Sequence, residues 1–118
     1  MSQAAQRLPE APAHLDRTLA ALADPHRRRV VDLLTGGPRA AGELARELDL
    51  TPPAMSRHLR TLRQSGLVEE SHPPFDARVR IYALRPEPMV HLLHWLEEAE
   101  RLWSEQLLAF KAHLEGEA

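Results

Sequence analysis

The stretch TPPAMSRHLRTLRQSGL, residues 51–67, decides how this 118-residue chain is interpreted. It begins with Thr51, a residue type that caps helices, followed by two prolines, which suit the first positions of a helix. Gly66, near its end, is a natural helix stop. The stretch therefore predicts a helix over residues 52–65, and this helix is basic although the whole chain has a formal net charge of −2.

The predicted helix has two unlike faces. At 100° per residue, Met55, Leu59 and Leu62 fall on one side and predict a buried stripe. Arg57 and Arg60 fall on the opposite side, and no acidic residue occurs anywhere in the stretch. A solvated helix usually mixes charge signs, whereas arginine pairs with phosphate oxygens and guanine edges. Because a basic face alone is also typical of plain surface, the neighbouring segments must decide between the two interpretations.

Three amphipathic segments precede this helix. Residues 14–23 and 25–35 space their leucines and valines as helices do, and Asp24 suits the cap of the second. Residues 39–50 predict a short third helix, separated from residue 52 by a brief turn. Two short helices joined by a tight turn are typical of a helix-turn-helix.

A change of period follows the basic helix. Residues 67–71 and 78–84 alternate with a period of two, and the intervening HPPFDA is rich in turn-forming residues. This pattern predicts a β-hairpin. We expect Arg78, Arg80 and Tyr82 on one face of the hairpin, with exposed arginines, and Val79 and Ile81 on the other.

The C-terminal segment reads as one long helix over residues 87–114, about 42 Å at 1.5 Å per residue. Its apolar residues stay within one stripe from Met89 to Leu114. A domain of about 70 residues cannot cover so long a stripe, so we expect a second copy to pack on it about a two-fold axis.

The order of these segments predicts a mainly α (α+β) fold. It is a winged helix-turn-helix with a two-stranded β-hairpin wing and a long C-terminal dimerisation helix. We divide the chain into a flexible N-terminal tail at residues 1–12, a DNA-binding domain at 13–85 and a dimerisation helix at 86–118.

Composition narrows the class of protein. The chain has no cysteine, which excludes disulfides, thiolate metal sites and cysteine redox chemistry. It shows no membrane helix and no signal-peptide pattern, so we expect a cytoplasmic protein without a membrane partner. Residues 51–80 carry five arginines against three acids, whereas residues 81–118 carry three basic residues against seven acids. The positive charge thus gathers where the helix-turn-helix and the wing are predicted, and a local basic patch suffices for DNA binding.

Three segments of the sequence resemble the ArsR (ArsR/SmtB) family of bacterial winged-helix repressors, in its cysteine-free subgroup. They are LADPHRRRVVDLL at residues 22–34, AGELARELDLTPPAMSRHLRTLRQSGLV at 41–68 and RVRIYAL at 78–84. The resemblance covers residues 15–84 well and implies a homodimer that represses a gene by binding a palindromic, double-stranded operator. It also implies that helix 52–65 enters the major groove and that the wing touches the backbone or the minor groove. Many members have a short glycine-containing turn at the wing tip, and this chain departs from them with PPFDA.

Eight residues are the predicted DNA contacts. The resemblance implies that Ser56 and Arg57 contact DNA and that two arginines of the wing do so as well. Within the helix we favour Ser56 and Arg57 for bases and expect Thr51, His58 and Arg60 to hold phosphates. Arg63 lies about 40° from Leu59 on the wheel, too near the buried stripe for such a role. The full predicted set is Thr51, Pro53, Ser56, Arg57, His58, Arg60, Arg78 and Arg80.

A second set is predicted to form the dimer interface, because the first and last helices dimerise in the family that the chain resembles. These residues are Leu15, Leu19, Leu92, Leu96, Ala99, Trp103, Leu107 and Phe110. The triplet Arg27–Arg29 is not predicted to be the main DNA surface, since consecutive helical positions point about 100° apart and the three cannot form one patch, although one of them could still reach a phosphate. We expect these arginines to pair with nearby acids such as Asp32.

Other functions remain open at this point. His91, His94 and Glu98 share a helical face and are weak candidates for a Zn²⁺ or Ni²⁺ site in a metal-responsive repressor, although a solvated polar face explains them as well. A winged-helix protein-interaction module would carry acids or apolar residues on the exposed face of helix 52–65, and these are absent. No nucleophile with its base, phosphate loop or paired carboxylates is recognisable, so neither an enzyme nor a cofactor is predicted, and the effector is unknown.

Overall fold

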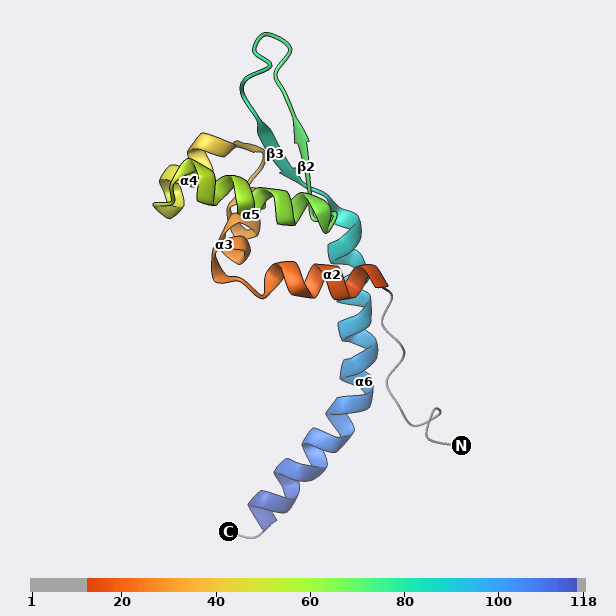
Figure 1. Cartoon of the computed structure of the whole chain (residues 1–118). Helices are drawn as coiled ribbons and strands as arrows, with labels where there is room; N and C mark the ends of the chain where they lie inside the picture. The colour runs from red at the N-terminus through yellow and green to blue at the C-terminus, as the bar shows by residue number, and fades with distance from the viewer. Residues whose placement is uncertain (1–12, 117–118) are drawn as a thin grey trace.

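The computed structural model of the chain describes residues 13–116 (Figure 1). The predicted N-terminal tail lies outside the described residues. The elements in chain order are α2 (Ala13–Leu22), α3 (Pro25–Leu34), β1 (Arg39–Ala40), α4 (Ala41–Leu48), α5 (Pro52–Gln64), β2 (Val68–Ser71), β3 (Ile81–Leu84) and α6 (Pro86–Gly116). The mainly helical winged helix-turn-helix architecture and the long C-terminal helix are confirmed.

Two helices, α3 and α5, begin with the capping residues predicted from the sequence. The Asp24 carboxylate accepts hydrogen bonds from the backbone N–H groups of His26 (2.8 Å) and Arg27 (3.1 Å) at the start of α3. The Thr51 hydroxyl accepts from the backbone N–H of Ala54 (3.3 Å) at the start of α5. Gly66 has a φ of +85°, a conformation that L side chains rarely adopt, which explains why α5 stops there.

The sheet differs from the predicted two-stranded hairpin. It has three antiparallel strands in the order β1-β3-β2, because the two residues of β1 pair with Tyr82 and Ile81 of β3. A two-residue strand has no alternation to detect, so the sequence pattern could not reveal it. The second strand of the hairpin, β3, also begins at Ile81 rather than at Arg78, and the wing (residues 68–84) therefore ends in a long loop (Figure 1).

One core holds the helix-turn-helix and the base of the wing together. Its members are almost fully buried: Ala21, Val30, Val31, Leu34, Leu44, Ala45, Leu48, Met55, Leu59, Leu62, Leu67, Val68 and Tyr82. The stripe predicted for α5 is confirmed, since Met55, Leu59 and Leu62 have exposed fractions of 1%, 0% and 0%. Burial of this stripe fixes α5 with its other face outward.

A second contact joins α2 to α6, and it corrects two of the interface predictions. Helix α2 packs across the N-terminal half of α6 (Figure 1). Leu15 and Ala99 have exposed fractions of 0% and 1% within a single chain. Both were predicted to lie in the dimer interface, but they have no surface left to offer a second copy.

Beyond this contact α6 projects away from the rest of the molecule (Figure 1). The radius of gyration is 19.3 Å, against about 13 Å for a compact domain of this size. Large apolar side chains are exposed along the projecting part: Leu102, Trp103, Leu107, Leu108, Phe110 and Leu114. Within residues 13–116, no helix is both long and apolar enough to cross a membrane.

Replacing Leu59 by Ala tests whether the core fixes α5. We expect the free energy of unfolding to fall by about 2–5 kcal/mol in urea or thermal denaturation, because a fully buried leucine leaves a cavity. Arg60→Ala, one position along and exposed, serves as the control and should leave stability within about 0.5 kcal/mol. A loss under 1 kcal/mol for Leu59→Ala would contradict the packing described.

Candidate nucleic-acid interface

The outward face of α5 presents two unengaged arginines. Arg57 and Arg60 are both exposed, and within residues 13–116 neither guanidinium makes a hydrogen bond or an ion pair. Their charge is not cancelled by acids on the same helix, because the 13 residues of α5 contain none. An exposed guanidinium without a partner is available to an external anion such as a DNA phosphate or a base edge.

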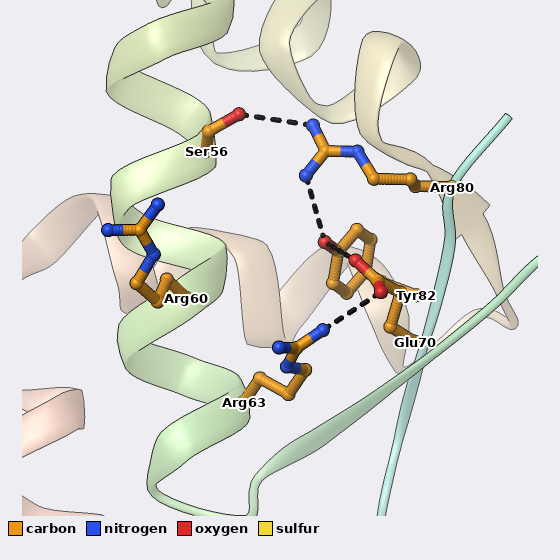
Figure 2. Close-up of a pocket in the computed structure, with 6 residues that line it drawn as sticks. All are labelled: Ser56, Arg60, Arg63, Glu70, Arg80 and Tyr82. Atoms are coloured by element: carbon orange, nitrogen blue, oxygen red, sulfur yellow. Dashed lines mark hydrogen bonds and ion pairs between the residues drawn. The ribbon is translucent and has the colours of Figure 1, made fainter. Parts of the chain in front are cut away.

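Ser56 and Arg80 are brought together although they lie 24 positions apart. One guanidinium nitrogen of Arg80, Nη2, donates to Ser56 Oγ at 3.0 Å, and Nη1 donates to the Tyr82 hydroxyl at 3.3 Å (Figure 2). Arg80 is half-buried rather than freely exposed as predicted. The structure thus places two predicted DNA contacts, one on α5 and one on the wing, in a direct hydrogen bond.

Arg63 points to the base of the wing. Its Nη1 donates to Glu70 Oε1 at 2.8 Å, and the other carboxylate oxygen of Glu70 accepts from the Tyr82 hydroxyl at 2.5 Å (Figure 2). The hydrogen bond from Tyr82, followed by the charge of Arg63, keeps the pKa of Glu70 below its ordinary value despite partial burial. Burial and the Glu70 carboxylate raise the pKa of Tyr82 further above neutral pH, where a phenol is already protonated and can donate.

Glu70 and Tyr82 were missed from the sequence. They are directly opposite in the β2–β3 register, which puts their side chains on one face of the wing. Alternation does place Tyr82 on the same face as Arg80, but the register that brings Glu70 opposite depends on the turn geometry. A turn containing two prolines and of undetermined type leaves that register open at the level of sequence.

His58 turns toward the start of α3 and away from the outward face. Its ring is 5.5 Å from that of His26, its Nδ1 lies 3.4 Å from Arg27 Nη1 and 4.0 Å from Asp24 Oδ1, and its side chain is 18% exposed. Burial lowers the pKa of His58, and the opposing effect of Asp24 is smaller. A partly buried neutral imidazole next to an aspartate is a poor anion ligand, so this placement does not favour the predicted phosphate contact, which stays a prediction.

The arginine triplet also differs from expectation. Arg27 Nε donates to the carbonyl of Ala21 at 2.7 Å, and Arg28 Nη1 donates to the carbonyl of Leu22 at 2.7 Å. These two arginines therefore satisfy the carbonyls at the C-terminus of α2, where cations are favoured, instead of pairing with Asp32. The prediction that the triplet is not a single DNA patch agrees with this geometry.

The remaining predicted contacts lie at the two ends of the surface. Thr51 and Pro53 are exposed at the N-terminus of α5. Arg78, near the wing tip, has a side chain 92% exposed and bonds Asp76 at 3.2 Å. Such an exposed pair is weak and can exchange for another anion. Phe75, beside it in sequence, is 88% exposed, an unusual position for a large apolar side chain.

The metal-site candidates engage separate partners. Glu98 forms an ion pair with Arg101, and the ring of His91 lies 4.5 Å from that of His14 on α2. Within residues 13–116 there is no group of three or more His, Cys, Asp or Glu side chains arranged to hold a metal ion. His91, His94 and Glu98 are suitably spaced along α6, but their side chains do not come together in one coordination site.

Comparisons with known proteins agree with the fold. A family model described as "Helix-turn-helix domain" matches residues 22–71. The HTH-type transcriptional regulator Rv2034 of Mycobacterium tuberculosis is 37% identical over 102 residues, which is 86% of this chain and 90% of that protein. A crystal structure of an ArsR family transcriptional regulator superposes with a TM-score of 0.71 at 35% identity, covering 80% of this chain and 95% of the other.

A further solved structure is informative about assembly. It is the solution structure of the homodimeric winged helix-turn-helix DNA-binding domain of Mb0332 from Mycobacterium bovis. It has a TM-score of 0.59 and 26% identity, over 75% of this chain and 82% of that domain.

His58 gives a pH-dependent prediction. Because the folded-state pKa of His58 is lowered from an ordinary value of about 6.5, the folded state favours the neutral ring. Its contribution to stability is present above the unfolded pKa and is lost as the pH falls through the lower folded value. We expect the wild-type melting temperature to drop between pH 7.5 and pH 5 by more than that of His58→Gln, and equal drops in both proteins would refute this role.

Proposed function

The chain belongs to the ArsR family of winged helix-turn-helix transcriptional regulators, and from this premise we propose that it binds a palindromic operator as a homodimer, with α5 in the major groove. The observation that carries this proposal is the pair of unengaged arginines, Arg57 and Arg60, on an outward helix face that bears no acid. DNA is the natural counterpart of such a face because its phosphates and guanine edges both accept hydrogen bonds from guanidinium groups.

The proposed roles follow from position on α5. Arg57 reads a base edge and Arg60 holds a phosphate. The N-terminus of α5, with Thr51 and Pro53, lies against the backbone, where the helix dipole favours an anion. Ser56, Arg78 and Arg80 complete the proposed contact set, and His58 is left out because it faces α3.

The exposed stripe of α6 supports the proposed homodimer. Apolar side chains between 41% and 63% exposed line the helix over several turns, and a second copy related by a two-fold axis would cover them. Leu15 and Ala99 are buried within the chain and are left out of the proposed interface. The proposed interface therefore consists of Leu19, Leu92, Leu96, Trp103, Leu107 and Phe110. Such a dimer would present two copies of α5 at half-sites about 34 Å apart, one turn of DNA.

We propose a role as repressor, in which the bound dimer blocks transcription where its operator overlaps a promoter. Because the proposed activity requires access to chromosomal DNA, it carries with it the cytoplasmic location expected from the sequence. A nuclease footprint on DNA from upstream of the protein's own gene, at low salt, tests both the binding and its symmetry. We expect two protected half-sites one turn apart, whereas an absence of protection at micromolar protein would refute the proposal.

Arg57→Ala tests the reading of bases. We expect binding to the protected site to weaken by about 1–3 kcal/mol in a gel-shift or anisotropy titration, while binding to a scrambled duplex weakens much less. Arg29→Ala removes the same charge from an exposed position on α3 and serves as the matched control. Equal losses on the two duplexes would mean that Arg57 contacts only phosphate.

Trp103→Glu tests the dimer. Trp103 is 41% exposed and packs edge-on against Trp95, at 5.9 Å between ring centroids. A carboxylate placed in an apolar interface would be desolvated without a partner, so we expect sedimentation as a monomer and loss of specific DNA binding. His94→Glu places a carboxylate at an exposed position on the opposite face of α6, about 180° from Trp103, and should remain dimeric; a tight dimer in Trp103→Glu would exclude this interface.

A further inference from the structure

Five side chains form one chain of hydrogen bonds between α5 and the wing. In order they are Arg63, Glu70, Tyr82, Arg80 and Ser56 (Figure 2). The chain starts and ends on α5, at positions seven residues and thus two helical turns apart. It crosses both strands of the wing on the way, so it ties the base of the wing to one stripe of α5.

Tyr82 is the central member of this network. Its ring is in the core, with an exposed fraction of 2%, and its position is therefore fixed by packing. Its hydroxyl donates to Glu70 at 2.5 Å and accepts from Arg80 at 3.3 Å. The guanidinium of Arg80 also lies 5.9 Å from the centre of the Tyr82 ring, within the range of a cation–π contact.

The network forms the wall of a pocket of about 300 Å³, lined by its five members and by Arg60. Ser56, Arg60 and Arg63 line it from α5 at spacings of four and three residues, and the others line it from the wing. In Figure 2 the side chains of Ser56 and Arg63 point toward the wing, whereas the guanidinium of Arg60 is turned away from Arg80. The lining residues include three arginines and one glutamate, which leaves two positive charges in excess. Within the described residues Arg60 makes no hydrogen bond or ion pair, so its charge is not used inside the protein.

We propose that Tyr82 and Glu70 are positioning residues for DNA binding: they hold Arg80 beside Ser56, so that Arg80 and Arg60 close on a single backbone phosphate at this pocket. The inference rests on the proposed function, since it specifies where α5 and the wing grip one DNA strand together. An arginine already held in place loses less side-chain freedom on binding than one that projects into solvent. Ser56 consequently serves as the anchor of Arg80, and its hydroxyl already accepts one hydrogen bond.

Tyr82→Phe removes the central hydroxyl and keeps the buried ring. The probe is a 30-bp duplex selected by the wild-type protein from a random-sequence library. We expect about 5- to 20-fold weaker binding, and a plot of log affinity against log salt that is shallower by about one, because one phosphate contact is lost. Thermal denaturation of the same sample establishes that the variant is folded at the temperature of the titration.

A double-mutant cycle separates positioning from a general effect on the fold. If Tyr82 acts through Arg80, adding Tyr82→Phe to Arg80→Ala changes the affinity less than twofold further. Arg78→Ala is the matched control, since it removes the same charge from the exposed part of the wing. Tyr82→Phe should keep its full effect in that background. Equal effects of Tyr82→Phe in both backgrounds would overturn the proposal.

Glu70→Gln gives a second, independent test. Removal of a negative charge close to DNA would by itself strengthen binding, whereas loss of a positioning residue weakens it. We expect Glu70→Gln to bind the selected duplex less tightly than the wild type, and tighter binding would overturn the proposal. If the wild-type protein selects no duplex at all, the proposed function fails as well. If the wild type binds and Tyr82→Phe binds equally well, the present inference alone fails.

Discussion

Burial of one stripe of α5 is the constraint on which the rest of the molecule depends. Met55, Leu59 and Leu62 are held in the core by α3, α4 and the base of the wing, so the helix cannot rotate about its axis. The opposite face of α5 therefore points outward, and this face carries arginines and no acidic residue. The basic surface is therefore a consequence of apolar packing, and a chain of negative net charge can still present it.

The arginines of this chain divide into those used inside the protein and those left for an external anion. Arg27 and Arg28 satisfy carbonyls at the end of α2, and Arg63 neutralises Glu70. Arg57 and Arg60 have no such partner among residues 13–116. Net charge does not distinguish the two groups, because the distinction lies in which donors are already satisfied. Arg29 on α3 also lacks a partner among residues 13–116, so the acid-free face of α5 is needed as well to mark the binding surface.

The sequence was most informative where a signal is local and periodic. The limits and the buried face of α5 follow from a cap, two prolines, a glycine and a stripe of three apolar residues. The three-stranded sheet, the Glu70–Tyr82 pair and the orientation of His58 could not be predicted, because each depends on residues from separate elements meeting in space. Leu15 and Ala99 show the same limit: helical spacing identified them as apolar contacts, but not whether the partner is α2–α6 packing or a second copy.

Because α2 packs across α6 within one protomer, this contact fixes the angle at which the projecting part of α6 leaves the rest of the chain. If two copies join along the distal part of α6, the distance between their α5 helices is set by the angle at which α2 holds α6. A palindrome with half-sites one turn apart tolerates little error in that distance. The rings of His14 and His91 meet at the α2–α6 contact. A small change in the angle between α2 and α6 at this contact would produce a larger change in the distance between the two α5 helices of the dimer.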